Sequence, residues 1–298
     1  MSERGFAIEE SDDGRALVVS GPWSAEAEAV IGSGAVDSLA LNRAWGFCES
    51  DLEFLRDWPI RGLTLLARGL SDLAPIGRLA GSLEYLSVEA ASRAQVDLQS
   101  FVRLQSLTGD WKHFRATVAR ATGLETLRTG NFSEVDLQAL AGFSRLRHLV
   151  IKAARRLESL AGLERLTSLS SFTLQLAPRL ADISAVAQLS SSLRELWFET
   201  CGGLDSIDDV AGLKHLRELW VADCGDIASL KPIAGLPELE ELFVWGTTRV
   251  LDADLSPIES LPRLREVRMK PRRAYRPPLA AVQSRLHGID DSGRTQDE

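Results

Sequence analysis

A leucine pattern recurs through most of this chain at a nearly constant interval. Each copy approximates LxxLxL, and clear examples are LRELWF at 193–198, LRELWV at 216–221 and LEELFV at 239–244. Neighbouring copies begin 20 to 25 residues apart. The eleven copies begin at Val36, Ile60, Leu83, Leu104, Leu124, Leu146, Leu169, Leu193, Leu216, Leu239 and Leu264. Self-similarity at such a period is typical of a solenoid, in which one small supersecondary unit stacks on the next.

Two apolar series within each copy predict its local structure. Positions 4 and 6, such as Leu196 and Phe198, are apolar and alternate with positions 3, 5 and 7. This period of two predicts a strand with one buried face. After the strand, apolar residues recur every three positions, as in Leu204, Ile207 and Val210. That spacing predicts a tight helical return whose inner edge packs on the strand layer.

The pattern resembles the leucine-rich repeat family, whose unit reads LxxLxLxxN/CxL. Cys201 and Cys224 stand at the position that takes Asn, Cys or Thr, and we align Thr247 with them. The copies are similar to the bacterial, internalin-like subclass with repeats of about 22–23 residues. The resemblance covers residues 36–270 and implies an α/β fold, a right-handed solenoid of about eleven repeats. A curved parallel sheet would line its concave face, and short helical or 3-10 returns would line its convex face. Partners of this family commonly dock on the concave face.

The ends of the chain lack the repeat. Near the amino end we expect a hairpin that turns at Asp13 and Gly14, a short helix that begins at Ser24, and Trp23 as an anchor. A solenoid needs its terminal apolar edges covered, so both ends predict caps. The predicted segments are an N-terminal cap at 1–35, the solenoid at 36–270, a C-terminal cap at 271–288 and a disordered tail at 289–298.

Composition limits the classes of partner. The chain has 42 acidic and 34 basic residues among 298, a net charge of −8, which argues against a nucleic-acid partner. No run of 18 apolar residues exists and the amino end is charged, so we expect a cytoplasmic protein without a membrane partner. The many Arg and few Lys residues indicate a bacterial source. Three cysteines without a CxxC pair predict buried side chains and no metal or cofactor.

The strand face that points away from the core changes character along the chain. In the first copies its residues are small or polar, as at Thr64, Ser87 and Thr108. In the last copies position 5 holds Trp197, Trp220 and Phe243, and position 7 adds Trp245. Because neighbouring parallel strands lie about 4.8 Å apart, these rings should form one contiguous ridge. Such a ridge predicts a binding surface. The alternative is that the rings only stack on one another, as a ladder that stabilises the repeats and binds nothing.

Position 3 of the same copies holds a glutamate column. Glu195, Glu218, Glu241 and Glu266 should face one another across adjacent strands, where like charges are destabilising. Arg194, Arg217 and Arg265 lie one residue earlier and are candidates to neutralise them; otherwise the column would favour a partner with a basic surface. The predicted partner-binding residues are Trp197, Trp220, Phe243, Trp245, Glu195, Glu199, Glu218, Glu241, Glu266 and Arg268.

These patterns favour a non-catalytic module that binds a protein or peptide partner. The alternative is a structural protein that self-associates through the aromatic ridge, as a homo-oligomer. An enzyme is the third class, but the chain has no GxxxxGK[ST], HExxH or GxSxG motif. Its four histidines fall in separate copies of the repeat. The scaffold alone does not identify a partner, because such folds serve many functions.

Overall fold

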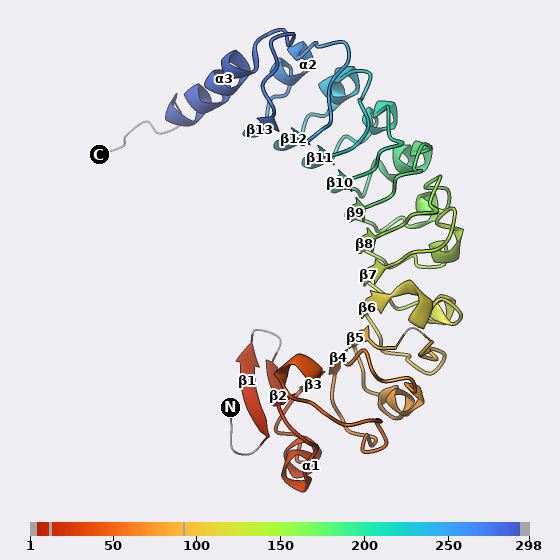
Figure 1. The fold of residues 1–298 in the computed structure, drawn as a ribbon. Coiled ribbons are helices and arrows are strands. Elements are labelled where there is room, and N and C mark those ends of the chain that lie inside the picture. The colour runs from red at the N-terminus through yellow and green to blue at the C-terminus, as the bar shows by residue number, and fades with distance from the viewer. Residues whose placement is uncertain (1–4, 12–13, 92, 293–298) are drawn as a thin grey trace. The chain divides into compact units, whose positions relative to one another are not determined.

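A computed structural model describes residues 5–11, 14–91 and 93–292. The chain forms two compact units, Met1–Asn131 and Phe132–Glu298 (Figure 1). The division falls inside the segment expected to be one solenoid. It falls inside the repeat that begins at Leu124; this repeat and the one that begins at Leu104 are short.

The first unit contains a hairpin, one α-helix and five repeat strands. Strand β1 pairs antiparallel with β2, and from β2 onward each strand pairs parallel with the next. The strands are β1 (Phe6–Ser11), β2 (Gly14–Val19), β3 (Ser38–Asn42), β4 (Gly62–Leu66), β5 (Tyr85–Glu89), β6 (Ser106–Asp110) and β7 (Thr126–Gly130). The helices are α1 (Ala25–Gly32) and the 3-10 turns η1 (Arg43–Trp45), η2 (Ala74–Leu79), η3 (Trp111–His113) and η4 (Val118–Arg120).

The second unit has six strands in chain order, and those from β8 to β13 pair parallel with their neighbours. They are β8 (His148–Lys152), β9 (Ser171–Gln175), β10 (Glu195–Glu199), β11 (Glu218–Ala222), β12 (Glu241–Trp245) and β13 (Glu266–Met269). The returns are η5 (Gln138–Leu140), η6 (Leu163–Arg165), η7 (Ser184–Leu189), η8 (Asp208–Val210), η9 (Lys231–Gly235) and α2 (Ser256–Glu259), and the unit ends with α3 (Leu279–Ser292). The strands line the concave side of this unit and the returns its convex side (Figure 1).

The leucine pattern locates every repeat strand. Each strand from β3 to β13 begins at the third position of its copy, as β10 begins at Glu195 in the copy that starts at Leu193. Equivalent residues pair directly, so Leu196 lies beside Leu219 and Leu219 beside Leu242. The predicted fold is confirmed: the chain is a leucine-rich repeat solenoid with parallel strands and 3-10 or short α-helical returns.

The core of each repeat lies between its strand and its return. Leu196, Phe198 and Leu219 are fully buried, as are Val210 and Leu213 from the following return. Burying a side chain of this size contributes about 1.5–3 kcal/mol relative to leaving it in water. Every repeat therefore depends on its neighbours to cover both apolar edges.

The two short repeats keep the strand but fill the core differently. Position 6 of the first of them is Gly109, and a Cβ there would lie 2.5 Å from the Val88 carbonyl oxygen. The missing side chain is replaced by Trp111 and Phe114, both 1% exposed, whose rings meet edge to face at 6.0 Å. Because these aromatics come after the strand, the leucine pattern alone does not reveal them.

The amino end contains the expected hairpin and helix. Ser24 caps α1 by accepting a hydrogen bond from the Ala27 N–H at 3.1 Å, and the Trp23 ring stacks on Phe54 at 4.3 Å. Asp13, one of the two expected turn residues, lies outside the described residues. Assignment of 1–35 as a cap stays a prediction.

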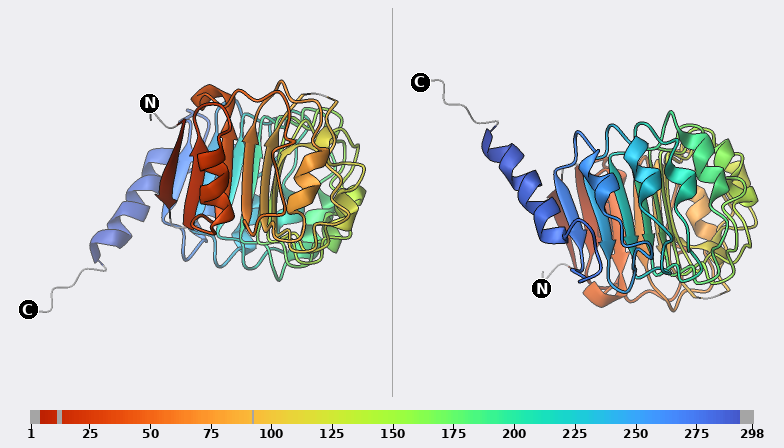
Figure 2. Two further views of the ribbon diagram at one scale, coloured as in Figure 1. Left: turned by 90° about the horizontal axis from the view of Figure 1, so that it is seen from below. Right: turned by 90° about the horizontal axis from the view of Figure 1, so that it is seen from above.

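The carboxy end carries a longer helix than expected. Helix α3, drawn in dark blue, continues beyond the last repeat of its unit (Figure 2). Gln283 in its second turn donates a hydrogen bond to the Val267 carbonyl of β13 at 3.1 Å. The expected boundary between a cap at 271–288 and a tail at 289–298 falls inside this helix, and residues 293–298 lie outside the described part of the chain.

A left-handed residue follows each strand from β8 to β12. The φ angles are 55° at Ala153, 58° at Leu176, 56° at Thr200, 50° at Asp223 and 69° at Gly246. Only one of these residues is glycine, for which such an angle is unstrained. The repeat geometry imposes this conformation on whatever residue stands there, so no residue type in the sequence marks it.

Candidate partner-binding site

The register of β10 to β13 brings the predicted residues together. Trp197 pairs with Trp220, Trp220 with Phe243, and Phe243 with Arg268. These residues form one column because each strand begins at the same position of its repeat and neighbouring strands pair without a shift. Their side chains point away from the leucine core, since side chains alternate between the two faces of a strand.

The three rings of this column form a continuous stack. The Trp197 and Trp220 ring centroids are 4.2 Å apart with planes 12° from parallel, and those of Trp220 and Phe243 are 3.9 Å apart at 18°. We call Trp197, Trp220 and Phe243 the aromatic stack. Each such pair contributes about 0.5–1.5 kcal/mol beyond the area that it buries. The ridge predicted from the sequence is therefore also a stabilising ladder.

Arg268 closes one end of the aromatic stack. Its guanidinium carbon lies 5.0 Å from the centroid of the Phe243 ring, within the range of a cation–π interaction. Its Nε also donates to a carboxylate oxygen of Glu266 on the same strand. Arg268 is thus engaged within its own chain at the end of the stack.

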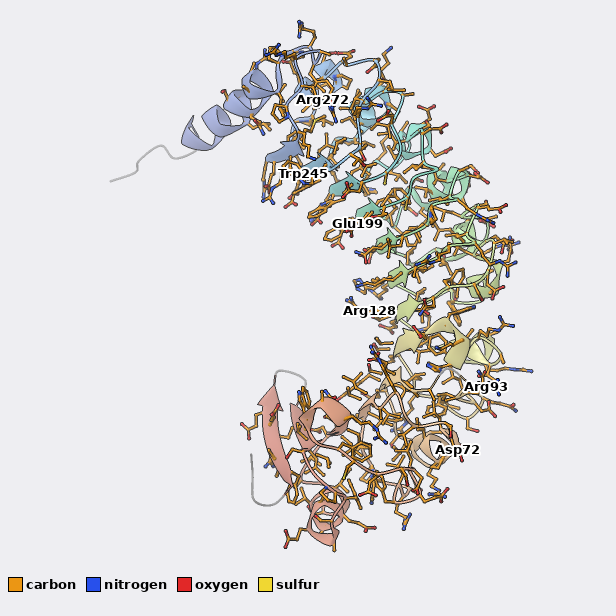
Figure 3. All side chains as sticks on the ribbon, in the orientation of Figure 1. Asp72, Arg93, Arg128, Glu199, Trp245 and Arg272 are labelled. Atoms are coloured by element: carbon orange, nitrogen blue, oxygen red, sulfur yellow. The ribbon has the colours of Figure 1, made fainter. Side chains whose placement is uncertain are left out.

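The four aromatic side chains of the predicted site differ in how much of each is exposed to solvent. Phe243 is only 5% exposed, because Trp220 covers one face of its ring and Arg268 lies over the other. The expectation that Phe243 points into solvent is wrong. Trp197 and Trp220 are partly exposed, and Trp245 is 47% exposed. Figure 3 shows Trp245 on the strand-lined side of the second unit.

The glutamate column forms as predicted, and the candidate arginines do not form ion pairs with it among the described residues. Glu195, Glu218, Glu241 and Glu266 pair in direct register across β10 to β13. Only Glu266, which pairs with Arg268, has an ion pair among the described residues. Like charges in this register are destabilising. Glu195, Glu218 and Glu241 are therefore without an ion pair in the described part of the chain.

The arginines that precede the column bind elsewhere. Arg194 donates to the carbonyls of Ser191 and Leu193 at 3.3 and 3.2 Å. Arg217 lies 3.9 Å from a Glu238 oxygen and Arg265 lies 3.6 Å from a Glu240 oxygen. Arg194 and Arg217 nevertheless line one hollow of about 380 Å³ with the column residues Glu195, Glu218 and Glu241. These two arginines therefore lie near the column without forming an ion pair with it.

Glu218, in the middle of the column, is perturbed by its surroundings. Partial burial raises the pKa of its carboxyl group, and the charges of Glu195 and Glu241 raise it further. The Trp197 indole acts in the opposite direction and lowers this pKa. The environment thus resists the ionised form of Glu218 and would favour a cation beside it.

Two indole nitrogens of the stack lack partners. Nε1 of Trp197 and Nε1 of Trp220 are buried without a hydrogen bond in the described structure. A buried, unpaired N–H is destabilising by roughly 1–3 kcal/mol. The Trp197 indole lowers the pKa of Glu218, although the two groups do not meet hydrogen-bond geometry. The stack therefore retains unused donors next to the glutamate column.

A hollow of about 470 Å³ lies over the aromatic stack. Its lining combines aromatic rings with polar groups, a combination typical of ligand sites. The lining residues are Thr173, Gln175, Trp197, Phe198, Glu199, Trp220, Ala222, Asp223, Phe243, Trp245 and Arg268. Thr173, Gln175 and Asp223 were missed by the sequence analysis, although they stand at positions 5, 7 and 8 of the repeat and the first two pair in register with predicted residues.

Cys201 and Cys224 are buried, as expected, whereas the expectation that Cys48 is buried is wrong, because its side chain is exposed. The Cys201 thiol donates to the Leu174 carbonyl at 3.8 Å, and the Cys224 thiol donates to the Ala222 carbonyl at 3.3 Å. The adjacent Cys224 thiol and burial raise the pKa of Cys201. The alignment of Thr247 with them is wrong: an extra residue after β12 puts Thr248 there, and its hydroxyl accepts from the Cys224 N–H at 2.8 Å.

Comparisons with known proteins support the fold. No protein-family model matches the sequence, and no curated protein sequence matches it. A solved leucine-rich repeat protein of Leptospira interrogans is similar in structure with a TM-score of 0.52 at 15% identity, and the match covers 84% of this chain and 76% of that one. An identity this low is evidence for the shared repeat fold alone.

Two solved internalins of Listeria monocytogenes are also similar to this chain. One matches at 19% identity and a TM-score of 0.49 over 72% of this chain and 68% of its own. The second, an internalin C2, matches at 20% identity and a TM-score of 0.43 over 59% and 78%. In the described part of the chain, no helix is long and apolar enough to cross a membrane.

Proposed function

We propose that the strand face of β10 to β13 binds a protein or peptide partner, and that the protein acts as a non-catalytic interaction module. The observation that carries the proposal is the hollow over the aromatic stack, which is lined by the rings of Trp197, Trp220 and Trp245 and by the Glu199 carboxylate. The glutamate column does not line this hollow but lies beside it on the same strands. Rigid repeats hold all of these groups, so a partner would meet a preformed surface.

The apolar part of the surface consists of Trp245 and the free parts of Trp197 and Trp220. Trp245 is nearly half exposed and lines the same hollow as the stack. Tryptophan is enriched among the residues that contribute most to binding energy. Phe243 has a different role: it supports Trp220 from inside the stack and offers little surface to a partner.

The charged part of the surface favours a basic partner. Glu195, Glu218 and Glu241 have no ion pair among the described residues, and the pKa of Glu218 is raised. A cation from the partner would relieve the repulsion within the column. Electrostatic complementarity of this kind contributes to specificity and to the association rate. Nucleic acid, which is polyanionic, is disfavoured on this face.

Affinity capture from the source organism, with the full chain as bait, tests this proposal. The Trp197→Ala, Trp245→Ala double variant should lose a basic partner that the wild type retains, whereas the Trp45→Ala variant should keep it. Trp45 is a matched control because it is 52% exposed and belongs to the other unit. Equal recovery of the same partner by the wild type and the double variant would exclude this face as the site.

Self-association is a distinct outcome that light scattering can separate. If the exposed Trp245 and the stack edges meet a second copy, the wild type is a dimer and the Trp197→Ala, Trp245→Ala double variant is a monomer. Under our proposal, the isolated wild type and the isolated double variant have the same molar mass.

A further inference from the structure

The two ends of the aromatic stack are not equivalent. At the β13 end, the guanidinium of Arg268 lies over the last ring. At the β9 end, the residue in register with Trp197 is Thr173. A threonine side chain is much shorter than an indole, so it covers only the part of the Trp197 ring that lies nearest the sheet. The outer part of that ring face opens into the hollow that Thr173 and Trp197 both line.

A carboxylate is already positioned beside this open ring face. Glu199 lies two residues after Trp197 and lines the same hollow (Figure 3). The Gln175 side-chain amide donates to Glu199 Oε2 at 2.7 Å and so holds the carboxylate in place. Among the described residues, nothing bonds to the other oxygen, Oε1. Lys152 is in register with Gln175 on the next strand, and in the described part of the chain it forms no ion pair with Glu199.

The β13 end of the stack shows which group such a site accepts. There Arg268 places its planar cation over Phe243 and donates a hydrogen bond to Glu266. The β9 end offers the same two elements, an open aromatic face and an adjacent carboxylate, without the arginine. Resting on the proposed function, we propose that the open face of Trp197 binds an arginine guanidinium of the partner, and that Glu199 accepts a hydrogen bond from it.

Arginine fits this position better than the other candidate side chains. Its guanidinium is flat and weakly hydrated, so it stacks on an indole while its edge N–H groups reach a carboxylate. Lysine carries a compact, strongly hydrated charge that cannot do both equally well. An aromatic side chain would stack, but it would leave Glu199 and the glutamate column without a counter-charge.

Titration of the full chain with short peptides tests this assignment. The probes are the capped tripeptides Gly-Arg-Gly, Gly-Lys-Gly and Gly-citrulline-Gly; citrulline keeps the shape of arginine but carries no charge. The seven indole N–H signals of the protein report which tryptophan is approached in an NMR spectrum. The arginine peptide should shift the Trp197 signal with a dissociation constant in the millimolar range, and citrulline should bind at least about fivefold more weakly.

Two variants separate stacking from charge. Glu199→Gln should weaken the arginine peptide about two- to fivefold, which is the effect of losing a solvent-exposed ion pair. In the wild type the Trp220 and Trp245 signals, from rings that line the same hollow, should shift together with that of Trp197. Trp197→Ala should abolish their response, while Trp197→Phe, which keeps a ring, should retain part of the affinity. Trp45→Phe, in the other unit, should change nothing.

The outcomes distinguish this inference from the proposed function. If citrulline or lysine binds as tightly as arginine, or if the arginine peptide leaves the Trp197 signal unmoved, the guanidinium site is wrong. If a capped Gly-Phe-Gly peptide shifts Trp197 in that case, the surface still binds an apolar group and the proposed function stands. The proposed function itself fails only if affinity capture is indifferent to Trp197→Ala, Trp245→Ala.

Discussion

The Arg268 guanidinium lies 5.0 Å from the Phe243 ring centroid and closes the aromatic stack from within the chain. The sequence places both residues among the candidates for partner binding. In the structure, the two residues contact each other. The Arg268 guanidinium covers the apolar Phe243 ring, and it also donates a hydrogen bond to Glu266. Both residues therefore contribute first to the stability of the last repeats, and the surface left for a partner lies toward Trp197 and Trp245.

Arg268→Ala should reduce stability more than removal of another surface arginine. The substitution uncovers Phe243 and releases Glu266, so we expect a loss of about 0.5–1 kcal/mol in the free energy of unfolding. Urea denaturation followed by tryptophan fluorescence measures it. Arg265→Ala is the control, because Arg265 pairs with Glu240 at 3.6 Å but covers no ring, and should change stability by less than about 0.5 kcal/mol. Equal losses in the two variants would contradict a structural role for the cation–π contact.

Trp220→Ala should destabilise the protein far more than Trp245→Ala. Trp220 stacks on two rings, at 4.2 and 3.9 Å, and both contacts disappear. We expect a loss of about 1–3 kcal/mol from the two pairs. Trp245 has no ring contact among the described residues and is 47% exposed, so its loss should be below about 0.5 kcal/mol. Chemical denaturation of both variants decides whether the ladder is a source of stability.

Glu218→Gln should stabilise the protein at neutral pH. The pKa of Glu218 is raised in the folded state, so the folded chain binds this proton more tightly than the unfolded chain does. The ionised Glu218 carboxylate therefore destabilises the folded state at any pH above its raised pKa. This destabilisation disappears as the pH falls through the raised pKa toward the usual pKa of a glutamate. Removing the charge should therefore add about 0.2–1 kcal/mol at pH 7, and the gain should shrink in acid.

Glu195→Gln is the control for this pH effect. Glu195 has one acidic neighbour in register, whereas Glu218 has two. The gain for Glu195→Gln should be the smaller one in denaturation curves measured across the acid range. A gain for Glu218→Gln that stays constant with pH would mean that repulsion in the column is not its source.

Thr200→Asn should stabilise the turn after β10. Thr200 is β-branched and has a φ of 56°, a conformation in which asparagine is much better tolerated. We expect a gain of about 0.5–1 kcal/mol in thermal or urea unfolding. Gly246 occupies the equivalent left-handed position after β12, with a φ of 69°. Gly246→Ala should be destabilising by about 1–2 kcal/mol, because a Cβ there would lie 2.0 Å from Asp223 Oδ1. The same sign for both variants would rule out backbone strain as the cause.

The leucine columns alone predict the strands correctly. Every copy forms its strand from the third position onward, even in the short repeats, where Leu107 and Leu127 still pair in register. This prediction succeeds because burial on one face fixes both the period and the register of a strand. The aromatic and glutamate columns follow from the same register, so their existence is also predictable from the sequence.

The finer features of the site depend on contacts that a repeat alignment does not contain. Phe243 is buried because the Arg268 side chain lies over it. Arg194 and Arg217 contact backbone carbonyls and Glu238 and form no ion pair with the column among the described residues. Side-chain conformations of this kind are chosen by local competition for partners. The guanidinium of Arg268 donates a hydrogen bond to the carboxylate of Glu266 on the same strand, and no periodic pattern in the sequence predicts this contact.

The spacing of the stacked rings bears on the mechanics of the last repeats. Neighbouring strands lie about 4.8 Å apart at the backbone, whereas the ring centroids are 4.2 and 3.9 Å apart. The rings are thus closer together than the strands that carry them, as expected on the inside of a bend. They act as a row of spacers in compression: tighter bending would drive them into one another, and flattening would pull them out of contact. We therefore expect β10 to β12 to be elastically stiffer than neighbouring repeats that carry small side chains at this position.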